Sequence, residues 1–341
     1  MASDPLALAA ALVDRGVVGA VQIAYRRGRT ITHAAYGACD EGTRFALASL
    51  TKPLLAAACL VACDEGVLDL DRPAADDVPE TACAGTLRDL LSHSSGLPAD
   101  SAVARRVQLD PMATWPEVAA AYAATVPVHA PLTRRTYSNA GYALAAIMLE
   151  RAADYPHAAY LRDAVLTPLG MERTELGVAP DADDVAKVRE PGLLGHGEQL
   201  FNGARFRALG LPQSGGFGTA TDYLAFLIAV AGQGPDLLDP ATRAELLTNQ
   251  GGALPGGVGD FMEWPVCDWA VGFELRDGKR PHWTGSALSA SSATHFGASG
   301  TLAFIDPVRD VQAVVLADRG TYSRWMLEPG GWPDLCAALV A

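Results

Sequence analysis

The chain has 341 residues, half of them hydrophobic and 19% charged, with a formal net charge of −13 and a sequence pI near 4.9. This composition is typical of a folded globular protein with a large core and excludes a disordered chain. The acidic balance, without a basic stripe, argues against nucleic acid as a partner and against docking on an anionic membrane, because both present negative charge.

The first residues, MASDPLALAAALVDRG, contain no basic leader and predict a short amphipathic helix rather than a signal peptide. No stretch of the sequence approaches the roughly 18–20 continuous apolar residues of a membrane span. We therefore expect a cytoplasmic protein. The sequence carries no signal for an oligomeric state.

Two β-hairpins are predicted, one toward each end of the chain. GAVQIAY and RTITHAAYG flank the turn at residues 26–28, and GTLAFID and VQAVVLADR flank residues 307–310. DLCAALVA then predicts a closing helix. We therefore expect an α+β fold in which residues 1–52 and 212–341 build one antiparallel sheet flanked by helices.

The middle of the chain, residues 53–211, is predicted to form an inserted, mostly helical domain. PLLAAACLVACDEG is apolar on all sides until Asp64 and predicts a fully buried helix. TLRDLLSHSSG, WPEVAAAYAAT and SNAGYALAAIMLERAAD predict further helices, as does TATDYLAFLIAVAGQG beyond this domain. Val178 to Gln213 is rich in Gly and Pro and predicts a long irregular loop.

The cysteines give no metal signature. Cys59 and Cys63 are four residues apart and share a helix face, but no second pair at a recognisable spacing completes a tetrahedral set. We interpret them as small buried hydrophobes. No metal or cofactor is expected.

The stretch FALASLTKP places a serine three residues before a lysine. Pro53 has no N–H, and its ring would clash with the carbonyl of Ser49, so a helix here begins no earlier than about Ser49. The positive end of the helix dipole then lies at Ser49. Lys52 lies one turn further along the same face, beside an apolar helix where a lysine is costly to bury. By itself this pair also fits a capping serine beside a solvated lysine.

Two further short motifs accompany this pair. Tyr137-Ser138-Asn139 precedes a predicted helix, and His295-Phe296-Gly297 precedes a predicted strand. Each alone fits a helix cap or a polar turn. Together, S-x-x-K, Y-x-N and H-x-G resemble the motif set of the serine β-lactamase and penicillin-binding-protein superfamily, in the branch with class C β-lactamases, family VIII esterases and D-aminopeptidase-like hydrolases. The resemblance runs from about Val18 to Arg319.

The resemblance implies a fold with the active site in a cleft between the sheet domain and the helical domain. It also implies roles for matching residues. Ser49 matches the nucleophile, Lys52 the lysine that takes or relays its proton, and Tyr137 the acid/base on the leaving group. Asn139 matches the asparagine that positions Lys52 and the substrate amide.

The third motif completes the implied site. His295 matches its first residue, where β-lactamases carry a lysine that helps to hold the antibiotic's carboxylate. Gly297 is expected to let the substrate lie against the strand. The backbone N–H groups of Ser49 and Ala298 match the oxyanion hole.

Either Lys52 or Tyr137 is a possible base. Lowering the pKa of Lys52 from about 10.4 to about 7 costs roughly 4–5 kcal/mol, and forming a tyrosinate at Tyr137 costs roughly 4 kcal/mol. A permanent cation in the third motif would favour tyrosinate, whereas His295 is mostly neutral at pH 7. We therefore favour Lys52 as the base and Tyr137 as a proton shuttle.

The sequence predicts a serine hydrolase that acts through an acyl-enzyme on a small neutral ester or amide, with at most weak β-lactamase activity. A transacylase using the same acyl-enzyme is the first alternative, and a non-catalytic binding or sensor protein on the same fold is the second. His93 is interpreted as a structural turn residue. Trp264, Trp269 and Trp283 fit either an acyl-pocket wall or core packing.

Overall fold

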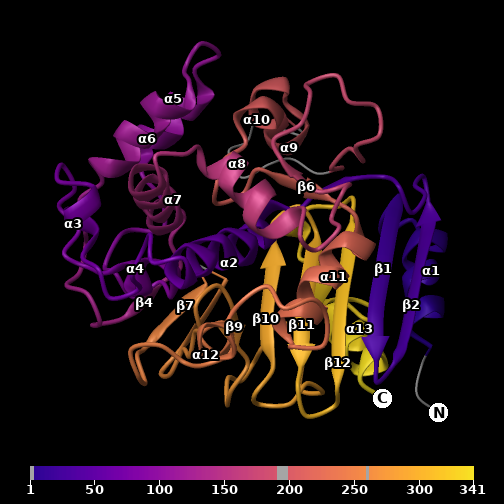
Figure 1. Ribbon diagram of the computed structural model, residues 1–341. Helices are drawn as coiled ribbons and strands as arrows, with labels where there is room; N and C mark the ends of the chain where they lie inside the picture. Colours follow the sequence, from indigo (N-terminus) through magenta and orange to yellow (C-terminus); the bar gives the residue numbers. More distant parts are fainter. Residues whose placement is uncertain (1–3, 190–198, 259–260) are drawn as a thin grey trace.

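The computed structural model describes residues 4–189, 199–258 and 261–341. Its largest element is a six-stranded antiparallel sheet in the order β2-β1-β12-β11-β10-β9 (Figure 1). The strands, which come from both ends of the chain, are β1 (Ala20–Arg27), β2 (Thr30–Gly37), β9 (Glu274–Leu275), β10 (Ala293–Gly297), β11 (Thr301–Asp306) and β12 (Val311–Ala317). The predicted α+β class is confirmed.

Both predicted hairpins are present, and they lie next to each other in the sheet. β1 pairs with β2 through Ile23 opposite Ala34, and β11 pairs with β12 through Ala303 opposite Val314. The two hairpins join where β1 pairs with β12, with Ile23 opposite Val315. The sheet therefore depends on segments almost 300 residues apart in the sequence.

Helices cover both faces of the sheet because successive strand residues point to opposite faces. Val21 and Ile23 pack with α1 (Pro5–Asp14) and α13 (Trp332–Leu339) in one apolar cluster. Ala20 and Ala24 face the opposite side, where α11 (Ala220–Val230) packs against β1 and β12. Among the described residues, no helix is long and apolar enough to cross a membrane.

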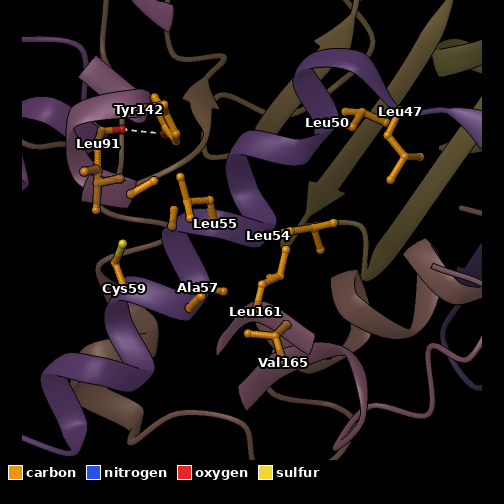
Figure 2. Close-up of a cluster of buried hydrophobic side chains, with 14 of the residues drawn as sticks. Leu47, Leu50, Leu54, Leu55, Ala57, Cys59, Leu91, Tyr142, Leu161 and Val165 are labelled. Carbon is orange, nitrogen blue, oxygen red and sulfur yellow. Dashed lines mark hydrogen bonds between the residues drawn. The ribbon is translucent and has the colours of Figure 1, made fainter. Parts of the chain in front are cut away.

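Helix α2 (Thr51–Asp64) lies at the centre of the molecule, and every residue from Thr51 to Ala62 is buried. Figure 2 shows Leu54 and Leu55 on different sides of this helix, with Leu54 toward Leu161 and Val165. α7 (Asn139–Ala153) packs against α2. This burial on all sides is the predicted consequence of an apolar sequence without a polar stripe.

The remaining helices surround α2 and α7. The hydroxyl of Tyr142 in α7 donates to the Leu91 carbonyl at 2.8 Å and ties α7 to α4 (Figure 2). These helices are α3 (Ala74–Asp77), α4 (Leu87–Leu91), α5 (Ala102–Leu109), α6 (Trp115–Ala123) and α8 (His157–Leu161), with α12 (Pro240–Ala244) packed against α2 from the later part of the chain.

The segment from Val178 to Gln213 differs from the predicted irregular loop. It contains α9 (Gln199–Asn202) and α10 (Ala204–Leu209), while residues 190–198 of that prediction lie outside the described residues. The rings of Phe201 and Phe206 are 5.2 Å apart at nearly right angles, and Phe206 also meets Phe217. Helices of one or two turns are too short for a hydrophobic periodicity to be recognised in the sequence. Here aromatic contacts hold them in place.

Two small sheets complete the fold near the start of α2. One has the order β3-β6-β5, formed by β3 (Phe45–Ala46), β6 (Gly216–Gly218) and β5 (Glu175–Leu176). The other has the order β4-β7-β8, formed by β4 (Arg135–Thr136), β7 (Gly256–Val258) and β8 (Met262–Trp264).

Candidate active site

Ser49 lies in a single 3₁₀ turn, η1 (Ala48–Leu50), between β3 and the first residue of α2. Ala48, directly before it, has φ of +47°, a left-handed conformation that is uncommon for a residue with a side chain. Hydrogen bonds hold the chain on the entry side. The hydroxyl of Ser299 donates to the Ala46 carbonyl at 2.5 Å, and that of Thr301 donates to the Leu47 carbonyl at 3.1 Å. The C-terminal strands thereby anchor the turn that presents Ser49.

Lys52 is completely buried, and its Nζ has three oxygen neighbours. It donates to Ser49 Oγ at 3.1 Å, to Asn139 Oδ1 at 2.8 Å and to the Gln213 carbonyl at 2.9 Å. Burial lowers the pKa of Lys52 from 10.5 to about 7, and the charge of Asp100 opposes this shift only in part. The side chain is therefore a buried amine in contact with the serine hydroxyl, and a large fraction of it is neutral at pH 7.

Tyr137 reaches the same serine from the start of α7. Its ring centroid lies 4.8 Å from Lys52 Nζ, and Tyr137 lines the cleft together with Ser49. Burial raises the pKa of Tyr137 well above its usual value, although the nearby Ser49 side chain acts in the other direction. Tyr137 is thus a neutral phenol, because the burial that favours the neutral, proton-accepting form of Lys52 disfavours a tyrosinate.

Asn139 is held at both ends of its amide. Oδ1 accepts from Lys52, while Nδ2 donates to Asp100 Oδ2 at 3.3 Å. Tyr122 donates its hydroxyl to the other carboxylate oxygen of Asp100 at 2.9 Å. These contacts orient the Asn139 carbonyl toward the lysine.

His93 lies directly behind Tyr137, with ring centroids 4.5 Å apart. Its Nδ1 accepts the Ser138 backbone N–H at 3.0 Å, so the neutral ring carries its proton on Nε2. Burial, and next the charge of Lys52, lowers the pKa of His93 well below its usual value. The ring is therefore a neutral support that packs against Tyr137 and fixes the chain immediately after it.

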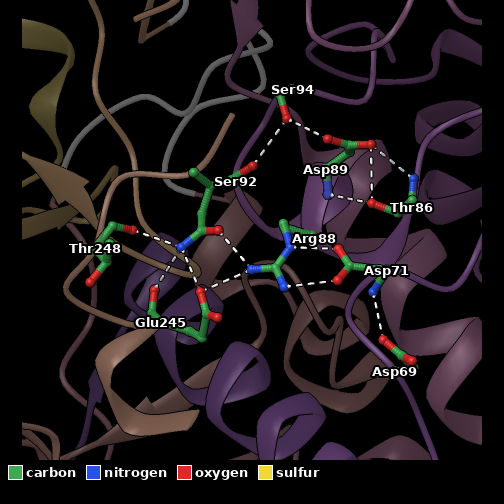
Figure 3. A network of polar contacts seen from close by, with 10 residues as sticks. Asp69, Asp71, Thr86, Arg88, Asp89, Ser92, Ser94, Glu245 and Thr248 are labelled. Carbon is green, nitrogen blue, oxygen red and sulfur yellow. Dashed lines mark hydrogen bonds and ion pairs between the residues drawn. The ribbon is translucent and has the colours of Figure 1, made fainter. Parts of the chain in front are cut away.

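The turn carrying His93 is tied down by serines on either side (Figure 3). Ser94 donates to Asp89 at 3.0 Å and lies 3.0 Å from the hydroxyl of Ser92. Asp89 also forms a capping box with Thr86 at the start of α4. His93 itself has φ of +61°. The prediction of a turn residue is confirmed, and the turn lies against the candidate site.

Arg88 extends this network across the molecule (Figure 3). Its guanidinium binds Asp71 at 2.7 Å and Glu245 at 2.9 Å. The Glu245 pair joins α4 to the chain directly after α12, and the Asp71 pair joins α4 to the chain between α2 and α3.

His295 is buried rather than displayed on a wall of the cleft. Only 2% of the residue is exposed, and its ring lies 6.0 Å from that of Tyr137 and 6.0 Å from that of Trp269. Burial, and next the charge of Lys52, lowers the pKa of His295 to about 3. Nδ1–H donates to the Phe296 carbonyl at 3.0 Å, so Nε2 is an unprotonated acceptor. His295 is therefore neutral, and its ring lies with those of His93 and Trp269 around the Tyr137 ring.

Close packing explains why the third motif has a glycine, Gly297, at its last position. A Cβ on Gly297 would lie 2.3 Å from the Leu47 carbonyl oxygen and 3.2 Å from the Ala48 Cβ. The small residue therefore lets β10 approach the serine turn, while the approach of substrate to the strand stays a prediction. Ala298, the next residue, lines the cleft together with Ser49, and the oxyanion hole of their N–H groups stays a prediction.

A cleft of about 1070 Å³ opens at Ser49. Tyr137, Asn139 and Ala298 line it beside the serine. The structure thus brings together Ser49, Lys52, Tyr137 and Asn139, with Ala298 at the opening and His295 behind them. Trp264, Trp269 and Trp283 are each at most 3% exposed and form core packing.

Several contributors were missed by sequence reasoning. Gln213 contacts Lys52, and Asp100 contacts Asn139. The Gln213 contact uses a backbone carbonyl, which any residue supplies.

Among the described residues, no group of three or more His, Cys, Asp or Glu could hold a metal ion. Burial raises the pKa of both Cys59 and Cys63, which keeps the two thiols protonated.

Comparison with known proteins identifies the family. A family model described as Beta-lactamase matches residues 7–324. A beta-lactamase from Mycobacterium bovis, known from its crystal structure, is 31% identical, with 96% of this chain and 97% of that chain covered and a TM-score of 0.71. The chain therefore belongs to the beta-lactamase family.

Two curated relatives extend this similarity. Protein Rv1367c of Mycobacterium tuberculosis is 31% identical over 260 residues, which cover 65% of this chain but only 64% of that protein's length. Esterase EstB of Burkholderia gladioli is 28% identical, with 90% of this chain and 88% of EstB covered. The D-amino acid amidase of Ochrobactrum anthropi is 21% identical, covers 98% of this chain and 97% of its own, and has a TM-score of 0.77, which shows a shared fold.

Proposed function

We propose that the protein is a serine hydrolase that cleaves a small neutral ester or amide through a covalent acyl-enzyme on Ser49. The observation that carries this proposal is the buried amine of Lys52, 3.1 Å from Ser49 Oγ and with its pKa lowered to about 7. A serine hydroxyl is a weak nucleophile until a base takes its proton, and a neutral amine in hydrogen-bond contact can do so.

The proposed reaction has two halves. Ser49 Oγ attacks the carbonyl carbon while its proton passes to Lys52, and the N–H groups of Ser49 and Ala298 stabilise the oxyanion. Tyr137 then donates its proton to the departing oxygen or nitrogen and regains one from Lys52. Water attacks the acyl-enzyme by the same route in reverse, which releases the acid and restores the serine.

The preference for a neutral substrate follows from the third motif. With a pKa near 3 and its ring buried, His295 supplies no cation for a carboxylate at neutral pH. A β-lactam antibiotic would therefore lose the contact that the β-lactamase lysine supplies, and its cleavage is expected to be weak. The similarity to an esterase supports the ester half of the proposal.

The test is covalent labelling. We expect an alkyl phosphonate to add one adduct on Ser49, and a p-nitrophenyl ester to be turned over. Both reactions should disappear in Ser49→Ala and persist in Ser291→Ala, a control at an exposed serine. Intact mass and p-nitrophenolate release give the two readouts.

Other outcomes of this labelling experiment would favour one of the two alternative functions, a transacylase or a binding protein. An adduct without turnover, with turnover restored by added alcohols or amines, would identify a transacylase. No adduct would remove the enzyme proposal in favour of a binding protein. Rapid cleavage of nitrocefin would contradict the argument from His295.

The pH dependence of the first half-reaction follows from Lys52. Only the neutral amine accepts a proton, and its fraction rises as the pH passes upward through a pKa of about 7. We expect kcat/KM for a neutral ester to fall about tenfold per pH unit below about pH 6 and to level off above about pH 8. A plateau that persists to pH 5 would contradict Lys52 as the base.

A further inference from the structure

We infer that the natural substrate carries an apolar chain of medium length on one side of the scissile bond, held in an arm of the cleft that runs from Ser49 between α5 and α10. The inference rests on the proposed hydrolase function. It narrows the substrate class from any neutral ester or amide to one with a hydrophobic chain.

The walls of this arm are apolar on both sides. α10 and the residues after it contribute Phe206, Leu209 and Leu211, and α5 contributes Leu109. Phe206 and Leu211 are nearly buried, whereas Leu109 is 54% exposed although it lines the cleft. An exposed leucine at the edge of an apolar cavity gains from a chain that covers it, because burying apolar surface is favourable.

A second apolar wall lies on the sheet side of the serine. Phe296 and Phe261 face the cleft with ring centroids 5.7 Å apart, and Val258 lies beside them. The Phe296 ring also packs against Trp283 and Trp332, which anchor it in the core. These residues add apolar surface to the cleft that Ser49 lines.

The charged groups on the cleft wall have neighbours of their own. Arg105 lies 4.0 Å from Asp100. Arg205 donates to the Ala113 carbonyl and so bridges α10 to the chain before α6. The guanidinium carbon of Arg324 lies 5.9 Å from the centre of the Phe261 ring. Each of these three cleft-wall arginines therefore has a partner.

The size of the cleft also exceeds what a short ester fills. Pockets for drug-sized ligands usually enclose about 300–1,000 Å³, and this cleft encloses about 1070 Å³. An acetyl or propionyl group would leave most of it to water. Each methylene that enters the arm is expected to raise kcat/KM by about three- to fourfold until the arm is filled.

The experiment compares chain-length series at concentrations below substrate aggregation. In one series the p-nitrophenyl ester is fixed and the acyl chain grows from acetate to decanoate. In the other the acetyl group is fixed and the alcohol grows from methyl to octyl, with acid release as the readout. We expect kcat/KM to rise through several methylenes in one series and then to level off.

A matched pair of variants tests whether the arm causes the rise. Leu109 and Val103 are both exposed apolar residues of α5, but only Leu109 lines the cleft. Leu109→Glu should flatten the rise, and Val103→Glu should keep the wild-type slope. Circular dichroism and thermal unfolding of both variants show whether the fold is kept.

The outcomes separate this inference from the proposed function. Turnover of short esters with no rise in either series overturns the inference and leaves the hydrolase intact. A rise that Leu109→Glu does not reduce also overturns the placement of the chain. Absence of both turnover and a Ser49 adduct overturns the hydrolase proposal, and the inference with it.

Discussion

Replacement of Lys52 by methionine is expected to lower kcat/KM for neutral esters by about 10²–10⁴-fold, the usual contribution of a positioned general base. Methionine has nearly the length of the lysine side chain but cannot accept the Ser49 proton. Because burying the amine is costly, thermal stability should change little or rise, although Asn139 and the Gln213 carbonyl lose a donor. Initial rates and a thermal melt on the same sample separate chemistry from folding.

The control for this variant is Lys187→Met, because Lys187 is exposed. It should keep wild-type kinetics. Phosphonate labelling of Ser49 in Lys52→Met should slow in parallel with turnover. Activity within tenfold of wild type would mean that another group takes the serine proton.

Replacement of Tyr137 by phenylalanine is expected to have an effect that depends on the leaving group. The ring and its packing against His93 remain, while the hydroxyl that reaches Ser49 is removed. An amine or alkoxide needs a proton to depart, so turnover of alkyl esters and amides should fall by about 10²–10⁴-fold. p-Nitrophenolate leaves without a proton near neutral pH, so its esters should lose far less.

This split is measured by running one p-nitrophenyl ester and one alkyl ester of the same acid side by side. Tyr36→Phe, at a half-buried tyrosine on β2, serves as the control. Equal losses on both substrates would show that Tyr137 acts on the serine rather than on the leaving group.

The local elements of the fold were readable because each has its own pattern. The hairpins β1–β2 and β11–β12 carry strand-forming residues around short turns, and α2 carries an unbroken apolar run. The pair of Ser49 and Lys52 was readable because three residues make one helical turn, whatever the rest of the chain does.

Of the contacts around Lys52, the one to Asn139 was expected only from the family resemblance and the one to the Gln213 carbonyl was not expected, since both come from distant segments. Its Nζ meets Asn139 and the Gln213 carbonyl, which lie 87 and 161 residues away in the sequence. The burial of His295 depends on the packing of Trp269 and Tyr137, which no local pattern reports. For the same reason the position of His295 behind the cleft, rather than on its wall, emerged only from the structure.

The pairing of β1 with β12 has a consequence for biosynthesis. The first hairpin leaves the ribosome long before its partner strand exists, so its edge stays open until nearly the whole polypeptide has been translated. The turn that displays Ser49 is braced by Ser299 and Thr301, which are also made late. Ribosome-bound fragments that end before β10 should therefore contain the nucleophile in the primary structure but remain unable to react with a phosphonate.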